Sequence, residues 1–87
     1  MNEHCRTKFK LLAVVNSLFG AEKVRFLKLI NALNDFYDAY DKLRVEARVR
    51  PSPEKTQRVQ EALERYQLLA TDITLSLTLA RILPDLV

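Results

Sequence analysis

The sequence predicts an all-α fold, in which two long helices form an antiparallel hairpin and a short N-terminal helix packs beside them. Apolar residues recur at alternating steps of three and four over residues 26–47, and again over residues 59–80. This spacing is typical of helices that each bury one narrow stripe against another helix. A Pro-Ser-Pro corner at residues 51–53 separates the two stretches. The chain has a single glycine, which argues against a fold with many turns.

The first helix is expected over residues 7–19, because Phe9, Val15 and Phe19 fall on one stripe of a helix. Gly20 follows the last apolar residue and can adopt the left-handed conformation that often ends a helix. Residues 1–6 are polar and are expected to be flexible, as chain ends usually are.

The second helix is expected over residues 21–48. This segment contains no proline or glycine and is rich in residues with high helix propensity. Arg50 directly precedes Pro51, and the residue before a proline is disfavoured in helical conformation. The second helix is therefore predicted to stop just before the corner.

The third helix is expected over residues 53–83. Ser52 is a favourable N-cap, Pro53 suits the first helical position, and Pro84 is predicted to end the helix. Residues 73–79 also alternate apolar and polar side chains, which is a strand pattern. Helix is favoured here because the heptad spacing continues through the segment and a lone strand would have no partner.

Folding at the corner sets Phe36 opposite Tyr66 and Leu29 opposite Ile73, so that large and small residues can interleave. The 87 residues make a single domain near the lower size limit for an independent core. Chains of this size often complete their core by association. Two architectures follow, a three-helix bundle and a dimeric four-helix-type bundle, and the sequence leaves both open.

Several apolar residues lie away from the predicted seam and form a candidate protein interface. These residues are Val24, Leu27, Leu68, Leu75, Leu79 and Ile82. Either the first helix covers them, or a second copy or another protein does. A short helix cannot shield two helices of about 40 Å along their full length. We therefore expect helix-mediated self-association, with a homodimer as its simplest form.

A cluster of basic residues at the hairpin tip is a second candidate contact surface, for an anionic partner. It consists of Arg44, Arg48, Arg50, Lys55 and Arg58. The alternative is ordinary solvated charge, because the net charge of the chain is only +3. A nucleic-acid-binding regulator that uses this tip and the basic N-terminus is thus an alternative function, although no short helix-turn-helix arrangement supports it.

The sequence offers no catalytic, cofactor-binding or metal-binding set, so an enzyme is not expected. Asp35, Asp38 and Asp41 are predicted to face solvent on the side opposite the seam. His4 and Cys5 are the only residues of their types and lie near the expected flexible end, whereas a zinc site needs three or four ligands. One glycine is too few for a phosphate-binding loop.

The single cysteine excludes an intrachain disulfide, which favours a reducing compartment such as the cytoplasm. No apolar run reaches the roughly 18–20 residues that span a bilayer. The predicted function is that of a small adaptor, chaperone-like or regulatory subunit that acts by associating through its helices.

Overall fold

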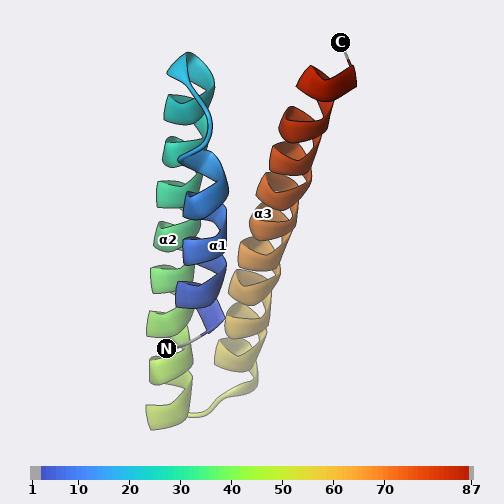
Figure 1. Ribbon diagram of the computed structural model, residues 1–87. Helices are drawn as coiled ribbons and strands as arrows, with labels where there is room; N and C mark the ends of the chain where they lie inside the picture. The colour runs from blue at the N-terminus through green and yellow to red at the C-terminus, as the bar shows by residue number, and fades with distance from the viewer. Residues whose placement is uncertain (1–2, 87) are drawn as a thin grey trace.

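The structure, a computed structural model, describes the backbone of residues 3–86 and the side chains of residues 3–79. It contains three helices, α1 (Glu3–Val15), α2 (Gly20–Val49) and α3 (Pro53–Leu86), and the described residues include no strand. α2 and α3 run antiparallel from the corner, and α1 lies along them parallel to α3 (Figure 1). The predicted all-α hairpin with a short N-terminal helix is confirmed.

The molecule is elongated. Its principal extents are 54 × 21 × 20 Å and its radius of gyration is 15.6 Å, compared with about 12 Å for a compact domain of this length. α3 packs mainly on α2, and α1 packs more extensively on α2 than on α3. α1 is much shorter than either long helix, so it covers only part of the hairpin (Figure 1).

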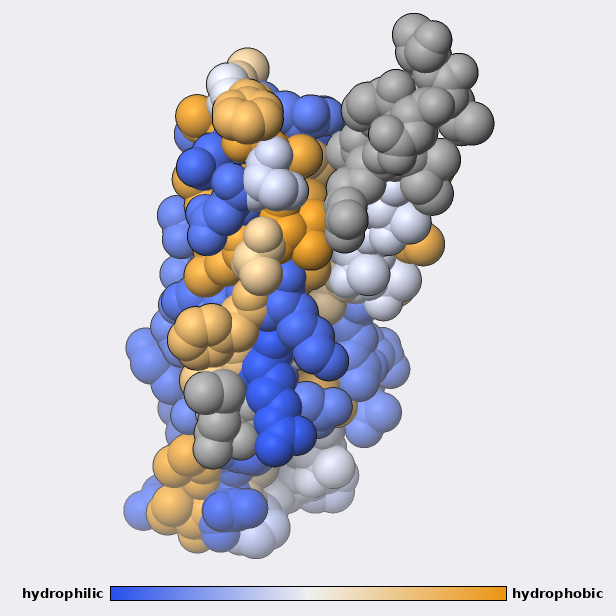
Figure 2. Space-filling view, in the orientation of Figure 1, coloured by the Kyte–Doolittle hydropathy of each residue, from blue (hydrophilic) through white to orange (hydrophobic). Residues whose placement is uncertain are grey.

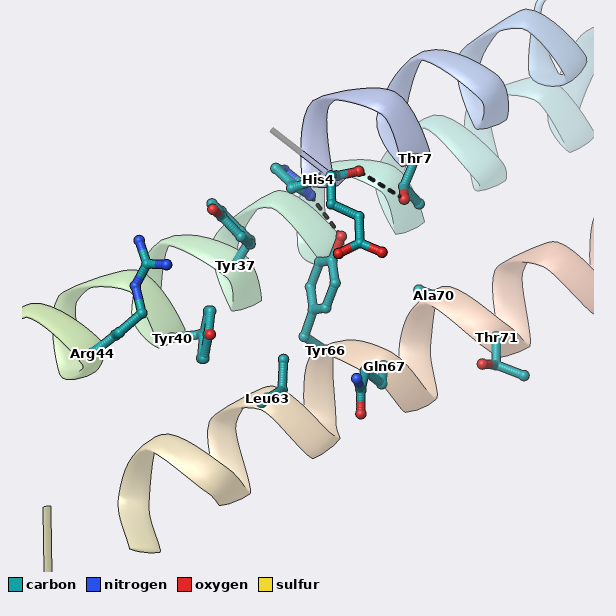
Figure 3. A pocket seen from close by; sticks show the side chains of 11 residues that line it. His4, Thr7, Tyr37, Tyr40, Arg44, Leu63, Tyr66, Gln67, Ala70 and Thr71 are labelled. Atoms are coloured by element: carbon teal, nitrogen blue, oxygen red, sulfur yellow. Dashed lines mark hydrogen bonds between the residues drawn. The ribbon is translucent and has the colours of Figure 1, made fainter. Parts of the chain in front are cut away.

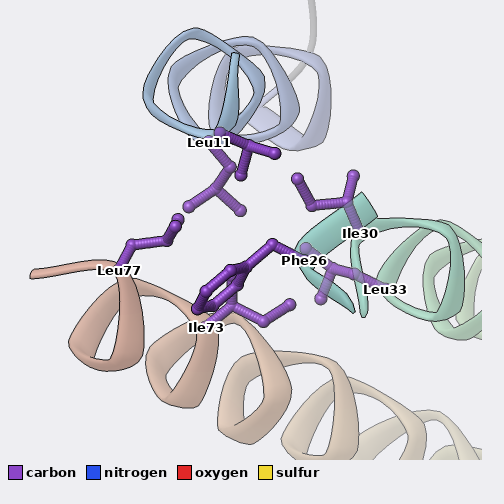
Figure 4. Close-up of a cluster of buried hydrophobic side chains, with 7 residues drawn as sticks. Leu11, Phe26, Ile30, Leu33, Ile73 and Leu77 are labelled. Atoms are coloured by element: carbon purple, nitrogen blue, oxygen red, sulfur yellow. The ribbon is translucent and has the colours of Figure 1, made fainter. Parts of the chain in front are cut away.

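The core lies where α1 crosses the hairpin, and all three helices contribute to it (Figure 4). Val15, Leu33 and Ile73, one from each helix, are fully shielded from solvent. The complete buried set is Leu11, Val15, Phe26, Ile30, Leu33, Ile73 and Leu77. Since these side chains meet only when α1 is docked, α1 is part of the core.

The buried stripe of α2 differs in part from the predicted seam. Phe26 and Leu33 are buried as expected, but Ile30 is also buried, and Phe36 is 41% exposed. The predicted packing of Phe36 in the hairpin seam is therefore wrong. The reason is that α2 packs against two helices, which turns its buried stripe from the two-helix seam toward the side that faces α1.

The ends of α1 also differ from the prediction. The helix begins at Glu3 and ends at Val15, so the expectation of flexible residues 1–6 is wrong for residues 3–6, and residues 1–2 lie outside the described part. After Val15 the chain tightens into a turn, in which the Leu18 amide donates to the Val15 carbonyl at 2.9 Å. Gly20 begins α2 with a φ of 64°, and Phe19 lies in extended backbone before it.

The corner is built as the sequence predicts. Arg50 leaves the helical conformation, and its amide still donates to the Glu46 carbonyl at 3.1 Å. The Ser52 hydroxyl accepts a hydrogen bond from the Lys55 amide at 3.2 Å, which caps the start of α3. Pro53 occupies the first helical position, where its missing N–H costs nothing.

α3 is one continuous helix over residues 53–86. The strand alternative for residues 73–79 is excluded, because Ile73 and Leu77 of this segment are buried on one helical face. The predicted stop before Pro84 is wrong, because the helix runs on to Leu86. A proline keeps a helical φ and removes one backbone hydrogen bond, so it need not end a helix.

Candidate interaction site

The last described turns of α3 carry apolar side chains on two opposite faces. Ile73 and Leu77 are buried against α1 and α2. The other face carries three leucines that are largely in solvent: Leu68 is 71% exposed, and Leu75 and Leu79 are each 59% exposed. They are spaced at seven and four residues, so they form one ridge along the helix. We call this ridge, with Thr71, Asp72 and Thr78, the outer leucine face.

The outer leucine face is poor in charge. Between Arg65 and Arg81 of the sequence, Asp72 is the only charged residue, whereas solvated helix faces usually carry many charged and polar groups. Thr71 and Thr78 flank the ridge and are exposed. Apart from Asp72, the leucine and threonine side chains of this face lose little hydration when another helix covers them.

Two threonine hydroxyls beside the ridge, those of Thr74 and Thr78, already have acceptors within α3. The Thr74 hydroxyl donates to the Ala70 carbonyl at 2.8 Å, and the Thr78 hydroxyl donates to the Thr74 carbonyl at 2.9 Å. A hydroxyl with such a bond can be buried without leaving a donor unsatisfied. A helix that covers the ridge can therefore bury Thr74 and Thr78 at little cost in lost hydrogen bonds.

The other residues of the predicted interface have different positions. Val24 is 53% exposed near the start of α2. Leu27 is half-buried and packs against the core, so α1 and the core shelter it. The side chain of Ile82 lies outside the described residues. Of the six predicted residues, the structure brings Leu68, Leu75 and Leu79 onto one ridge.

Other apolar residues are exposed, but they do not form a comparable ridge. Figure 2 shows hydrophobic residues at the end of the molecule where α1 passes into α2. Phe19 is exposed in the connection there, and Phe9 is exposed on α1 between Lys8 and Lys10. Val45 and Val49 are exposed one turn apart on α2, next to the charged Glu46 and Arg48. Nearby charges or isolation distinguish these residues from the outer leucine face.

A polar cluster fastens the first turn of α1 to the hairpin, and sequence reasoning missed it. His4 is only 7% exposed. Its Nε2 lies 3.1 Å from Asn34 Oδ1. Its Nδ1 lies 2.8 Å from the Tyr66 hydroxyl (Figure 3). Because the amide oxygen of Asn34 can only accept, Nε2 donates to it. The Tyr37 ring stacks on His4 with a centroid distance of 4.2 Å.

This cluster borders a cleft of about 380 Å³ between the three helices (Figure 3). Burial is the main cause that raises the pKa of Tyr66, and Tyr37 and Glu3 add to it, while a hydrogen bond with Thr7 acts in the opposite direction. Both His4 nitrogens are engaged by protein groups. The polar groups at this end of the cleft thus hold α1 in place.

The basic residues of the hairpin tip are mostly solvated. Arg48, Arg50 and Arg58 are exposed. Arg44 is bound to Asp41 on the same helix, and this hydrogen bond is the main cause that raises the pKa of Arg44. The half-buried Lys55 contributes its backbone amide to the Ser52 cap. The side chains of three of the five predicted residues are therefore exposed to solvent.

Among the described residues, no three histidine, cysteine, aspartate or glutamate side chains are grouped so that they could hold a metal ion. Over the same part of the chain, none of the helices combines the length and the apolar character needed to span a lipid bilayer. Comparison with known protein families finds no matching family, and comparisons with curated proteins and with solved structures find no match either.

Proposed function

We propose that the protein is a non-enzymatic association subunit that presents the outer leucine face of α3 to another helix. One observation carries the proposal: Leu68, Leu75 and Leu79 form an exposed ridge on a helix whose opposite face already fills the core. Contiguous exposed apolar surface marks interaction sites. An adaptor, chaperone-like or regulatory role fits such a subunit, because each requires a docking surface and no reactive centre.

The geometry supports helix-on-helix docking in particular. The ridge follows the steps of seven and four residues that let a neighbouring helix place its own side chains between the leucines. A partner helix of about 15 residues is long enough to contact Leu68 and Leu79 together, since these two residues are about 16 Å apart along the axis. The partner helix belongs either to a second copy, as the sequence led us to expect, or to another protein, and sedimentation of the purified chain at several concentrations distinguishes the two cases.

Site-specific photocrosslinking in the native host tests the proposed function. A photoreactive phenylalanine replaces Thr71, which is exposed on the outer leucine face, and in a control it replaces Asp38, which is exposed on α2. We expect one discrete adduct from position 71 and none of the same mass from position 38. Leu75→Glu should abolish the adduct, because a charge in the ridge opposes burial. An adduct that survives Leu75→Glu, or no adduct from position 71, would reject the proposal.

A further inference from the structure

One residue of the outer leucine face constrains what can cover it. Asp72 is exposed in the middle of the ridge, and it lines the same surface hollow as Leu68 and Leu75. The residues Leu68, Asp72, Leu75 and Leu79 follow one another at steps of four, three and four, so Asp72 occupies a seam position. Any helix that covers the three leucines also removes water from the Asp72 carboxylate.

A carboxylate that loses its water needs a cation or strong hydrogen-bond donors in return. The nearest basic residue that precedes it on α3, Arg65, lies two turns away, about 10 Å along the axis, which is beyond the reach of an ion pair. Within the described residues, the ion pair found is that of Arg44 with Asp41. The compensating charge for Asp72 therefore has to come from the partner.

A second copy of the chain that pairs through the same face supplies that charge poorly. In an antiparallel pair with Leu68 of one copy opposite Leu79 of the other, Asp72 faces Leu75, and the two aspartates lie in adjacent layers. A parallel pair sets Asp72 directly against Asp72. A shift that brings Asp72 opposite Arg65 moves Leu75 opposite Ala62 and so gives up the leucine contacts. Like charges in the contact seam disfavour pairing of two identical helices. Coiled coils use the same repulsion to exclude wrong partners.

We propose that the partner of the outer leucine face is a basic amphipathic helix from another protein. Its apolar residues pack on Leu68, Leu75 and Leu79, and a lysine or arginine between them pairs with Asp72. The leucines supply the contact area, and the aspartate selects partners and disfavours self-pairing. This inference rests on the proposed function and specifies the partner for the same face.

A displayed library of helical peptides, with the positions of one face randomised, tests the inference against the full-length chain. We expect the selected helices to carry apolar residues at heptad spacing and a lysine or arginine in the layer of Asp72. Selection against the Asp72→Lys variant should instead enrich aspartate or glutamate at that position. Asp72 and Leu75 are exposed, so their variants should keep the fold, which circular dichroism checks.

Affinities of one selected peptide separate the two levels of the proposal. Asp72→Lys should weaken binding at least tenfold, and the matching lysine-to-glutamate change in the peptide should restore it. Asp38→Lys, the same charge change at an exposed position of α2, should leave binding unchanged.

The possible outcomes distinguish the two proposals. If Leu75→Glu abolishes binding but Asp72→Lys has no effect, the proposal of a basic partner is wrong, and the proposal that the outer leucine face is a docking surface is retained. If Leu75→Glu has no effect, both are wrong. A dimer of the unliganded chain that Leu75→Glu dissociates would identify a second copy as the occupant and overturn the inference.

Discussion

At the scale of single residues, His4 shows how one polar side chain fixes the position of a helix. Its ring is buried, stacks on Tyr37 and meets polar partners from both α2 and α3. A buried polar group is stable only when it is hydrogen-bonded, so the ring fits one position of α1 and few others. The apolar side chains of α1 stabilise its docking because they are buried in the core, and His4 determines the position of α1 along the hairpin.

Tyr66→Phe tests this role of His4. The substitution leaves His4 Nδ1 without its hydroxyl partner, and we expect a loss of about 1–2 kcal/mol in the free energy of unfolding. Urea unfolding measures the loss, and amide exchange should speed up most in α1. Tyr40→Phe is the matched control, since the Tyr40 ring contacts Tyr37 and Arg44. Equal effects of the two variants would contradict the role.

The raised pKa of Tyr66 predicts a dependence on alkaline pH. Burial favours the neutral phenol in the folded chain, so the folded pKa lies above the unfolded value of about 10. The stabilisation is fully present below pH 10 or so, and it is lost as pH rises through the folded pKa. The difference in stability between the wild type and Tyr66→Phe should therefore narrow above about pH 10 in urea unfolding. A constant difference up to pH 11.5 would be inconsistent with this.

At the scale of the elements, α3 divides into a face that holds the fold and a face that does not. We expect Ile73→Ala to cost about 2–5 kcal/mol, because it opens a cavity in a fully buried layer. Leu75→Ala, two residues away, should change the free energy of unfolding by less than about 0.5 kcal/mol. Thermal and urea unfolding of the two variants make the comparison. Similar costs for both would show that the outer face is packed against the protein itself.

The connection between α1 and α2 depends on the backbone of Gly20. Its φ is 64°, and a side chain there would meet no atom within 4 Å, so the constraint is conformational. Gly20→Ala should cost about 1 kcal/mol, because an L-residue is strained at positive φ. A synthetic chain with D-alanine at this position should be at least as stable as the wild type. Thermal unfolding that ranks L-alanine above D-alanine would rule out the assigned conformation.

How far the sequence predicts these elements depends on the range of the interactions involved. The corner was predictable, because Pro51, Ser52 and Pro53 act through local backbone preferences. The periodicity of apolar residues predicted α2 and α3. It also placed Ile73 on the buried seam and Leu75 away from it. It did not place α1 in the core, because docking of α1 depends on contacts with Ile30 and Tyr66 that are distant in sequence. The hydrogen bonds of the Thr74 and Thr78 hydroxyls to carbonyls of α3 were likewise found only in the structure.

At the scale of the whole molecule, the short α1 decides which surfaces stay open. It completes the hydrophobic core at one side of the hairpin, to which seven of the described side chains belong. The opposite side of α3 carries leucines that are exposed to solvent. These leucines are not needed for the hydrophobic core, which forms on the other side of the helix. Because the fold does not use this face and the face is nonetheless apolar, we propose that it serves association.

The most direct test of this account is protection of the outer leucine face in the native host. In a Cys5→Ala background, Thr78→Cys places a thiol on that face, and Val45→Cys places one on the exposed side of α2. A membrane-permeable maleimide should modify both thiols in the purified chain. In cells, the account predicts that position 78 is protected, that position 45 reacts, and that Leu75→Glu restores the reaction at position 78. Equal modification of both positions in cells would contradict it.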